Sequence, residues 1–236
     1  MQPIQLLHTL QLMDSFYPVG AFAYSDGLET AATDGHVHDA DSLRDWMDHF
    51  VESVFVPCEG LALVRSIRAL RISDHRALSE LDAELTAIRP ASAVRAASTG
   101  VGKRLLSSYG SICGDESFES LARLLPFGNA APAYALVFFH RGIPEREAAL
   151  AFGYNRLAGT VSAGLRLVSI GQQQGQALLT RSIEGLPSAV ERILDMKDEP
   201  LRSFSPMTEK PCAAVASWFS GEAVRIQVAM NPWYGC

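Results

Sequence analysis

The stretch 147–179 constrains the fold most strongly, because it carries a stripe of apolar residues beside a stripe of small ones. The apolar residues recur at steps of three and four, the spacing of one helical face: Leu150, Tyr154, Leu157, Val161, Leu165 and Val168. The small residues recur at steps of seven and four: Gly153, Thr160, Gly164, Gly171 and Gly175. Each glycine inside a helix costs about 1 kcal/mol relative to alanine, so we expect another backbone to pack closely against this stripe. We interpret 147–179 as one long, mostly buried central helix, and in the alternative Gly171 ends this helix and a second begins beyond it.

The rest of the chain predicts a helical fold. No segment between 28 and 196 alternates with period two, as a half-buried strand would. The fold class that we predict is therefore all-α, a single globular domain of about ten helices packed around the glycine-containing helix. The pattern predicts one helix that Pro57 ends, a next helix from Glu59, and a last helix that starts at 186–187. The periodicity is lost after about 206, so we expect a helical domain over 1–206 and a poorly ordered or loosely docked tail over 207–236.

Composition excludes several classes of function. The chain is 48% apolar and 19% charged, which is enough for a core and argues against general disorder. Its formal charge of −6 argues against nucleic acid as a partner, since phosphate binding requires clustered Lys and Arg. We find no secretion signal and no apolar run long enough to span a membrane. The four cysteines are far apart and form no CxxC pair, as expected of a reduced, cytoplasmic protein: Cys58, Cys113, Cys212 and Cys236.

Motifs that carry chemistry are scarce. His36 and His38 are two positions apart, so on a helix they diverge, and we interpret them as part of a solvated turn and not as metal ligands. No serine lies in a G-x-S-x-G elbow, and neither a Walker A loop nor a G-x-G-x-x-G fingerprint is present. Arg166 has two interpretations, a structural ion pair or helix cap and a functional group. The residues alone therefore predict no catalytic residue, no metal site and no cofactor.

Three motifs, taken together, are more specific. The first comprises LMDS at 12–15, PVGAFAYS at 18–25 and GLE at 27–29. The second comprises SAVRAAS at 92–98 and GKRLL at 102–106, and the third comprises VSAGLRLV at 161–168 with GQ at 171–172 and 175–176. In this order they closely resemble the signature of the UreF family of urease accessory proteins, and they cover the chain from about 6 to 196.

The resemblance implies a non-enzymatic scaffold of urease maturation. UreF-like proteins are all-α and homodimeric, bind the accessory protein UreD, also called UreH, and recruit the nickel-carrying GTPase UreG. Their assembly docks on apo-urease, where it helps to couple GTP hydrolysis to nickel insertion. A helical chain without a phosphate-binding loop fits this role, because a GTPase partner supplies that loop.

On this resemblance the partner-binding or ion-path residues lie in two segments, 18–29 and 166–176, together with one arginine of the second motif. These residues are Pro18, Gly20, Tyr24, Ser25, Gly27, Glu29, Arg95, Arg166, Gly171, Gln172 and Gln176. The chain departs from the family at Tyr24, where a histidine is usual, and after 207, where an Arg-bearing helical tail is usual. No metal ligand is therefore assigned.

Two alternatives come from other classes of protein. In the first, an all-α enzyme or small-ligand protein has its polar site around Tyr24, Ser25, Glu29 and Arg166, where a Glu paired with an Arg inside an apolar shell performs acid–base chemistry. In the second, the chain is an interaction module with unrelated partners. Turnover by the isolated chain distinguishes the enzyme from both kinds of scaffold.

Overall fold

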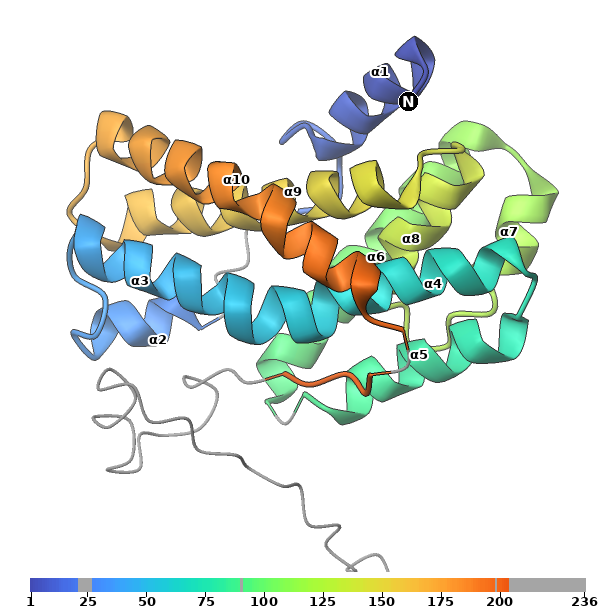
Figure 1. Ribbon diagram of the computed structural model, residues 1–236, viewed down its shortest axis with the longest axis horizontal. Coiled ribbons are helices and arrows are strands. Elements are labelled where there is room, and N and C mark those ends of the chain that lie inside the picture. The colour runs from blue at the N-terminus through green and yellow to red at the C-terminus, as the bar shows by residue number, and fades with distance from the viewer. Residues whose placement is uncertain (21–26, 90, 198, 204–236) are drawn as a thin grey trace, which may run out of the picture.

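The computed structural model describes residues 1–20, 27–89, 91–197 and 199–203, and these residues contain helices and no strand (Figure 1). The elements are α1 (Pro3–Met13), α2 (Leu28–Thr33), α3 (Ala40–Phe50), the π-helical η2 (Val51–Gly60), α4 (Leu61–Arg71), α5 (His75–Ala87), α6 (Ser92–Cys113), α7 (Glu116–Ala122), α8 (Ala130–His140), α9 (Glu145–Leu167) and α10 (Gln172–Asp195). The predicted all-α fold is confirmed. The predicted tail over 207–236 lies outside the described residues, as do Tyr24 and Ser25.

Helix α8 is almost completely buried. Its sequence is apolar on all sides up to Phe139, and every residue from Ala131 to Phe138 is buried. A helix with apolar residues all round must be covered on all sides. Helices α4, α6 and α9 pack against α8, and α5 and α7 complete its cover. Helix α9 packs against α1, α2, α3, η2, α4 and α10 as well as α8, and the central place of the glycine-containing helix stays a prediction.

Three elements, α3, η2 and α4, form one uninterrupted rod from Ala40 to Arg71. The predicted end of a helix at Pro57 is wrong, because Pro57 lies inside η2. In an α-helix the proline ring clashes with a carbonyl one turn earlier and removes one hydrogen bond. The wider π-helical turn accommodates the ring without ending the rod.

The predicted single helix over 147–179 is wrong, and the alternative break near Gly171 is confirmed. Helix α9 ends at Leu167, Val168 is extended (φ −120°, ψ 147°), and Gly171 caps the start of α10, where its N–H group donates to Gln174 Oε1 at 3.0 Å. Helix α10 then returns antiparallel along α9 (Figure 1). The predicted helix start at 186–187 is also wrong, because Pro187 lies inside α10 on its exposed side, where water can replace the missing N–H donor.

Close packing against the glycine stripe is confirmed, but side chains and not a backbone provide it. A Cβ atom at Gly153 would lie 2.8 Å from Leu186 Cδ1 and 2.8 Å from Phe55 Cζ, and one at Gly164 would lie 2.5 Å from Leu43 Cδ2. Real Cβ atoms do not approach so closely, so α3, η2 and α10 use the space that the glycines leave. Tyr154, predicted on the buried apolar face, is 41% exposed.

Candidate functional site

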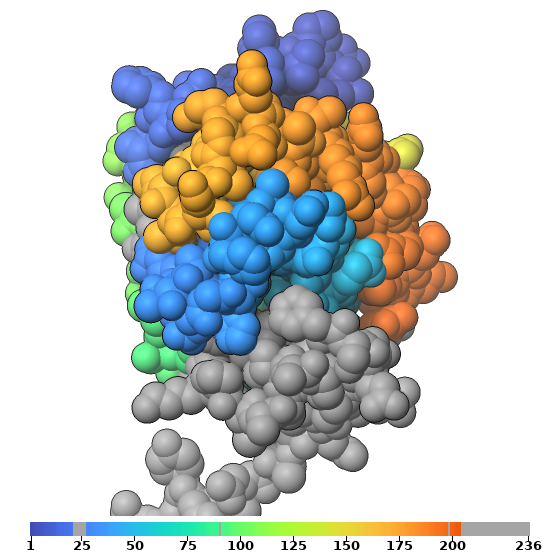
Figure 2. Space-filling view, turned by 90° about the vertical axis from the view of Figure 1, so that its left-hand side faces the viewer, coloured from blue at the N-terminus to red at the C-terminus, as the bar shows by residue number. Residues whose placement is uncertain are grey.

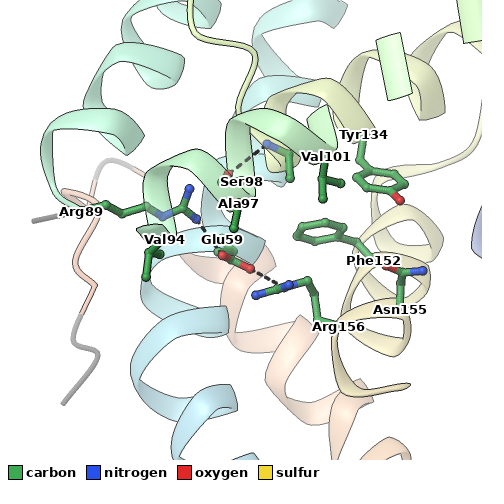
Figure 3. A pocket seen from close by; sticks show the side chains of 11 residues that line it. Glu59, Arg89, Val94, Ala97, Ser98, Val101, Tyr134, Phe152, Asn155 and Arg156 are labelled. Carbon is green, nitrogen blue, oxygen red and sulfur yellow. Dashed lines mark hydrogen bonds and ion pairs between the residues drawn. The ribbon is translucent and has the colours of Figure 1, made fainter. Parts of the chain in front are cut away.

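Glu59, Arg89 and Arg156 form a buried cluster that we call the clasp (Figure 3). The Glu59 side chain, in the last turn of η2, is 9% exposed. Arg89 Nη2 donates to Glu59 Oε1 at 2.7 Å, and Arg156 Nε donates to Glu59 Oε2 at 2.8 Å. Arg89 precedes α6 and Arg156 lies on α9, so one carboxylate joins three parts of the chain. Charged hydrogen bonds of this kind are strong because little water competes with them.

The clasp continues into a second buried carboxylate, Asp82 on α5. Arg89 Nη1 donates to Asn129 Oδ1 at 3.2 Å, and Asn129 Nδ2 donates to Asp82 Oδ1 at 2.8 Å. The Asp82 carboxylate also accepts the backbone N–H groups of Phe127, Gly128 and Asn129 at 2.8, 2.9 and 2.8 Å. These groups precede α8, so Asp82 places a negative charge at the N-terminus of α8, which the helix dipole favours.

A cavity of about 30 Å³ lies beside the clasp. Its polar lining residues are Glu59, Arg89, Ser98, Tyr134, Asn155 and Arg156, and its apolar ones are Val94, Ala97, Val101, Ala130 and Phe152. Figure 3 shows Tyr134, Phe152 and Asn155 together on the wall opposite Glu59 and Arg89. Because both Glu59 oxygens already accept hydrogen bonds from arginines, proton abstraction there would require the clasp to open. The arrangement is suited to holding helices together.

A second polar cluster fastens α6, α7 and α8 to one another. The Tyr109 hydroxyl lies 2.7 Å from His140 Nδ1, and His140 Nε2 lies 3.0 Å from Asp115 Oδ2. Hydrogen bonds from Ser117 and His140 lower the pKa of Asp115 to about 2, whereas burial raises the pKa of Tyr109 to about 12. Both shifts keep the groups in the forms that this cluster requires, a carboxylate and a neutral phenol.

Six of the predicted site residues lie on one end of the molecule, which we call the exposed end: Gly27, Glu29, Arg166, Gly171, Gln172 and Gln176. There α2 packs against α9, and α3 packs against α9 and α10. Figure 2 faces this end and shows the α9–α10 turn against residues of α2 and α3. Glu29, Arg166, Gln172 and Gln176 are all exposed. Gly171, the cap of α10, lies in the same turn.

The structure explains the backbone role of two glycines at the exposed end. Gly27 caps α2 with φ +92°, a conformation that L side chains rarely adopt. Gly171 has an extended backbone, and its N–H group donates a hydrogen bond to the Gln174 side chain. Arg166 Nη1 donates to Ser162 Oγ at 3.2 Å, one turn earlier on α9. The structure thus brings residues 27–29 of the first motif next to the third motif.

The other described candidates lie elsewhere. Pro18 and Gly20 are exposed, and Gly20 has φ +65° beside the Arg104 guanidinium, whose Nε donates to the Val19 carbonyl at 2.8 Å. Arg95 donates to the carbonyl oxygen of Arg89, so it lies next to the clasp and not at the exposed end. The predicted residues therefore occupy three separate places among the described parts of the chain.

The enzyme alternative required Glu29 and Arg166 inside an apolar shell. Both side chains are exposed, so this shell is not formed by the residues that the structure describes. Among those residues no three His, Cys, Asp or Glu side chains are grouped closely enough to hold a metal ion. No helix of the described segments is both long and apolar enough to cross a membrane.

Sequence reasoning missed the clasp, although one of its members carried a signal. Glu59 is the single charged residue between 53 and 64, and a charge in such an apolar run is buried and must be paired. The partners carry no comparable signal, because Arg89 and Arg156 are 30 and 97 positions away along the chain. Only the tertiary fold identifies them.

Comparison with known proteins identifies the family. The UreF family model matches residues 37–183, more than half of the chain. The urease accessory protein UreF of Microcystis aeruginosa is 32% identical over 201 residues, which are 85% of this chain and 89% of that protein. UreF of an Arthrobacter species is 34% identical over 203 residues (84% and 88%), and UreF of Methylobacillus flagellatus is 31% identical over 204 residues (85% and 89%). The chain belongs to the UreF family of urease accessory proteins.

Proposed function

We propose that this chain works in the cytoplasm as a non-enzymatic scaffold of urease maturation. As a homodimer it bridges UreD/UreH and the GTPase UreG on apo-urease, and it helps to couple GTP hydrolysis to nickel insertion. Membership of the UreF family supports the urease accessory role. The observation that carries the scaffold role is the gathering of the 27–29 and 166–176 segments at the exposed end, while the buried carboxylates are occupied by hydrogen bonds within the fold.

The chemistry of the exposed end suits contact with another protein. The first turn of α10 carries three consecutive exposed glutamines, 172–174, and Gln176 follows one position after a buried glycine. Amide side chains both donate and accept hydrogen bonds, and they lose less hydration free energy than charged groups when a partner covers them. Glu29 and Arg166 provide one charge of each sign nearby. Such a surface can bind a protein and release it again.

The proposed function is tested by complementation in cells that lack their UreF gene and contain the UreD, UreG and urease genes of this chain's source. The wild-type chain is expected to restore nickel-dependent urease activity and to co-purify with UreD and UreG. Replacing Arg166, Gln172 and Gln176 together by Ala should abolish co-purification and leave circular dichroism unchanged. The matched control is Glu119→Ala, an exposed residue of α7 at the other end of the molecule, which should retain both activities.

Two outcomes would contradict the scaffold. A folded wild-type chain that fails to restore urease with its own partners present would exclude the proposed role. Substrate turnover by the isolated chain, lost in Glu29→Gln, would favour the enzyme alternative.

A further inference from the structure

Helix α1 is apolar on its exposed side as well as on its buried side. It contains no Asp, Glu, Lys or Arg between Pro3 and Met13. On one side, Thr9, Leu12 and Met13 are buried against the rest of the fold. The other side lies at the surface of the molecule (Figure 1) and carries four aliphatic residues that are 46–60% exposed: Ile4, Leu6, Leu7 and Leu10. We call these four residues the α1 patch.

The α1 patch is continuous around the helix. With about 3.6 residues per turn, its four residues fall within one arc of about 160°. Phe16, which follows α1, is 94% exposed and adds a fifth large apolar side chain. A helix that is apolar all round is normally covered on all sides, and an exposed apolar patch marks a contact with another molecule. The described fold covers one side of α1, so the patch requires a cover from outside that fold.

The size of the patch matches a contact between two copies of the chain. Large apolar side chains offer roughly 150–250 Å² each, so the α1 patch and Phe16 together expose on the order of 600 Å². Two copies can therefore bury about 1,200 Å², the lower end of the range for specific, stable interfaces. Interfaces between identical chains are also more apolar than transient ones, which fits a patch without any charged residue.

The two ends of α1 favour an antiparallel copy of the same helix. A helix has a partial positive charge at its start and a partial negative charge at its end. In α1 the first turn has no acidic residue and the last turn has no basic one, and the exposed Asp14 adds a negative charge at the end. In an antiparallel pair the end of each helix lies beside the start of the other, so the charges of the two copies are complementary.

We propose that α1 is the contact helix of the homodimer, and that the α1 patches of two copies pack antiparallel across a two-fold axis. In such a contact both copies use the same surface, which must be complementary to itself. A surface of aliphatic side chains with opposite charges at its two ends meets that requirement. This inference rests on the homodimer of the proposed function and identifies its contact surface.

The proposed contact lies away from the exposed end. Gln5 Nε2 donates to the Gly142 carbonyl oxygen at 2.5 Å, so the start of α1 is fixed beside the start of α9. The exposed end lies at the other end of α9, which is 23 residues long, or about 35 Å. Dimerisation through α1 therefore leaves the glutamines of α10 open to other proteins.

Sedimentation velocity of the full-length chain tests the contact. Wild type is expected to be a dimer at tens of micromolar. Leu7→Lys places a charge in the middle of the patch and should raise the dissociation constant of the dimer about 100-fold or more, because a charge is not tolerated unpaired among apolar side chains. Circular dichroism should not change, since Leu7 is 60% exposed.

The matched control is Ile72→Lys, at a 76% exposed position just after α4, which should remain a dimer. A monomeric wild type would overturn the proposal. So would a dimer that survives Leu7→Lys, because the two copies would then meet through another surface.

A mixture of oppositely charged variants identifies what covers the patch. Leu7 lies in the middle of the patch and therefore nearest the two-fold axis, where it meets its own copy. Leu7→Glu alone should be monomeric like Leu7→Lys, whereas an equimolar mixture of the two should form a heterodimer that high salt weakens. A mixture that stays monomeric would overturn the pairing of two α1 patches.

Urease restoration in cells that lack their UreF gene separates this inference from the proposed function. A wild-type chain that forms a Leu7-dependent dimer but fails to restore urease would contradict the proposed function alone. A wild-type chain that restores urease while its dimer survives Leu7→Lys would contradict this inference alone.

Discussion

The clasp and the exposed end use charged and polar side chains in opposite ways. Helix α9 contributes an arginine to each, and the two lie ten positions apart. Arg156 is mostly buried and binds Glu59, whereas Arg166 is exposed in the last turn. Polar groups in the clasp are shielded from water and hold helices together, so substitution there should reduce stability. Polar groups at the exposed end are already hydrated, so substitution there should affect partners and leave the fold intact.

The largest loss of stability is expected from Asp82→Ala. This change leaves three backbone N–H groups before α8 without their acceptor, those of Gly128 and Asn129 in a buried place, while the Asn129 amide keeps the Asp82 carbonyl and the Thr86 hydroxyl. We expect the free energy of unfolding to fall by about 4 kcal/mol, measured by chemical denaturation. Asp41→Ala, an exposed carboxylate that binds Arg44 on the surface, should lose less than about 1 kcal/mol. Equal losses of unfolding free energy in Asp82→Ala and Asp41→Ala would contradict the expected difference between a buried and an exposed carboxylate.

Glu59→Gln tests the clasp itself. The amide cannot balance two guanidinium groups, and its NH₂ group would face one of them, so we expect a loss of about 3 kcal/mol in the free energy of unfolding. The matched control is Glu52→Gln on the same π-helical segment, where the carboxylate makes two hydrogen bonds to Arg192 at the surface. There the loss should stay below about 1 kcal/mol. Urea denaturation of both variants measures the difference.

Two glycine-to-alanine changes separate tight packing from helix propensity. At Gly102 of α6 a Cβ atom would overlap the Gly128 carbonyl and the Asn129 backbone, which Asp82 holds in place. We expect Gly102→Ala to lower the free energy of unfolding by about 2 kcal/mol. At Gly159 of α9 a Cβ atom meets nothing within 4 Å, so Gly159→Ala should raise it by about 0.5–1 kcal/mol. A loss at Gly159 would show that α9 packs more tightly than described.

The Asp115 cluster gives a pH dependence of known sign. Hydrogen bonds from Ser117 and His140 lower the folded-state pKa of Asp115 to about 2, against about 3.9 in an unfolded chain. A carboxylate whose pKa is lowered by folding stabilises the native state above pH 4, and the contribution is lost as the pH falls from about 4 to 2. Wild type should therefore exceed Asp115→Asn in Tm at pH 6, and the difference should shrink towards pH 2. A constant difference would show that the carboxylate acts through its shape alone.

The smallest effect on stability is expected at the exposed end. Gln172→Ala and Gln176→Ala should each change the free energy of unfolding by less than about 0.5 kcal/mol. Denaturation curves that coincide with wild type, together with weaker co-purification of UreD or UreG, would confirm that these amides serve partners. A large loss of stability in either variant would show instead that these amides stabilise the fold.

Local sequence patterns predicted the helices better than their arrangement. The period of the apolar residues identified an all-α fold, because that period reflects a single helical face. It could not identify the break at 168–171, because Val168 and Ile170 continue the apolar pattern while the backbone is extended. Nor could it show that η2 continues through Pro57, because a proline normally ends an α-helix and the apolar period does not distinguish a π-helical turn from an α-helical one.

The candidate site also has one part that the sequence indicated and one part that only the fold reveals. The family motifs named residues in both segments of the exposed end, but that 27–29 lies beside 166–176 is known only from the fold. The clasp is assembled from residues on different helices, and Arg89 reaches Asn129 across 40 positions. Of its members only Glu59 could be suspected from its apolar surroundings. Pairing between distant charges depends on the fold and has no periodic signal.

The uninterrupted rod from α3 through η2 has a mechanical consequence. The start of α3 lies at the exposed end, and Glu59 lies further along the same rod, with no loop to act as a hinge between them. A displacement of the start of α3 along the rod axis would therefore also displace the Glu59 carboxylate. Arg89 and Arg156 lie outside the rod, so such a displacement would either lengthen their hydrogen bonds to Glu59 or move both side chains with it.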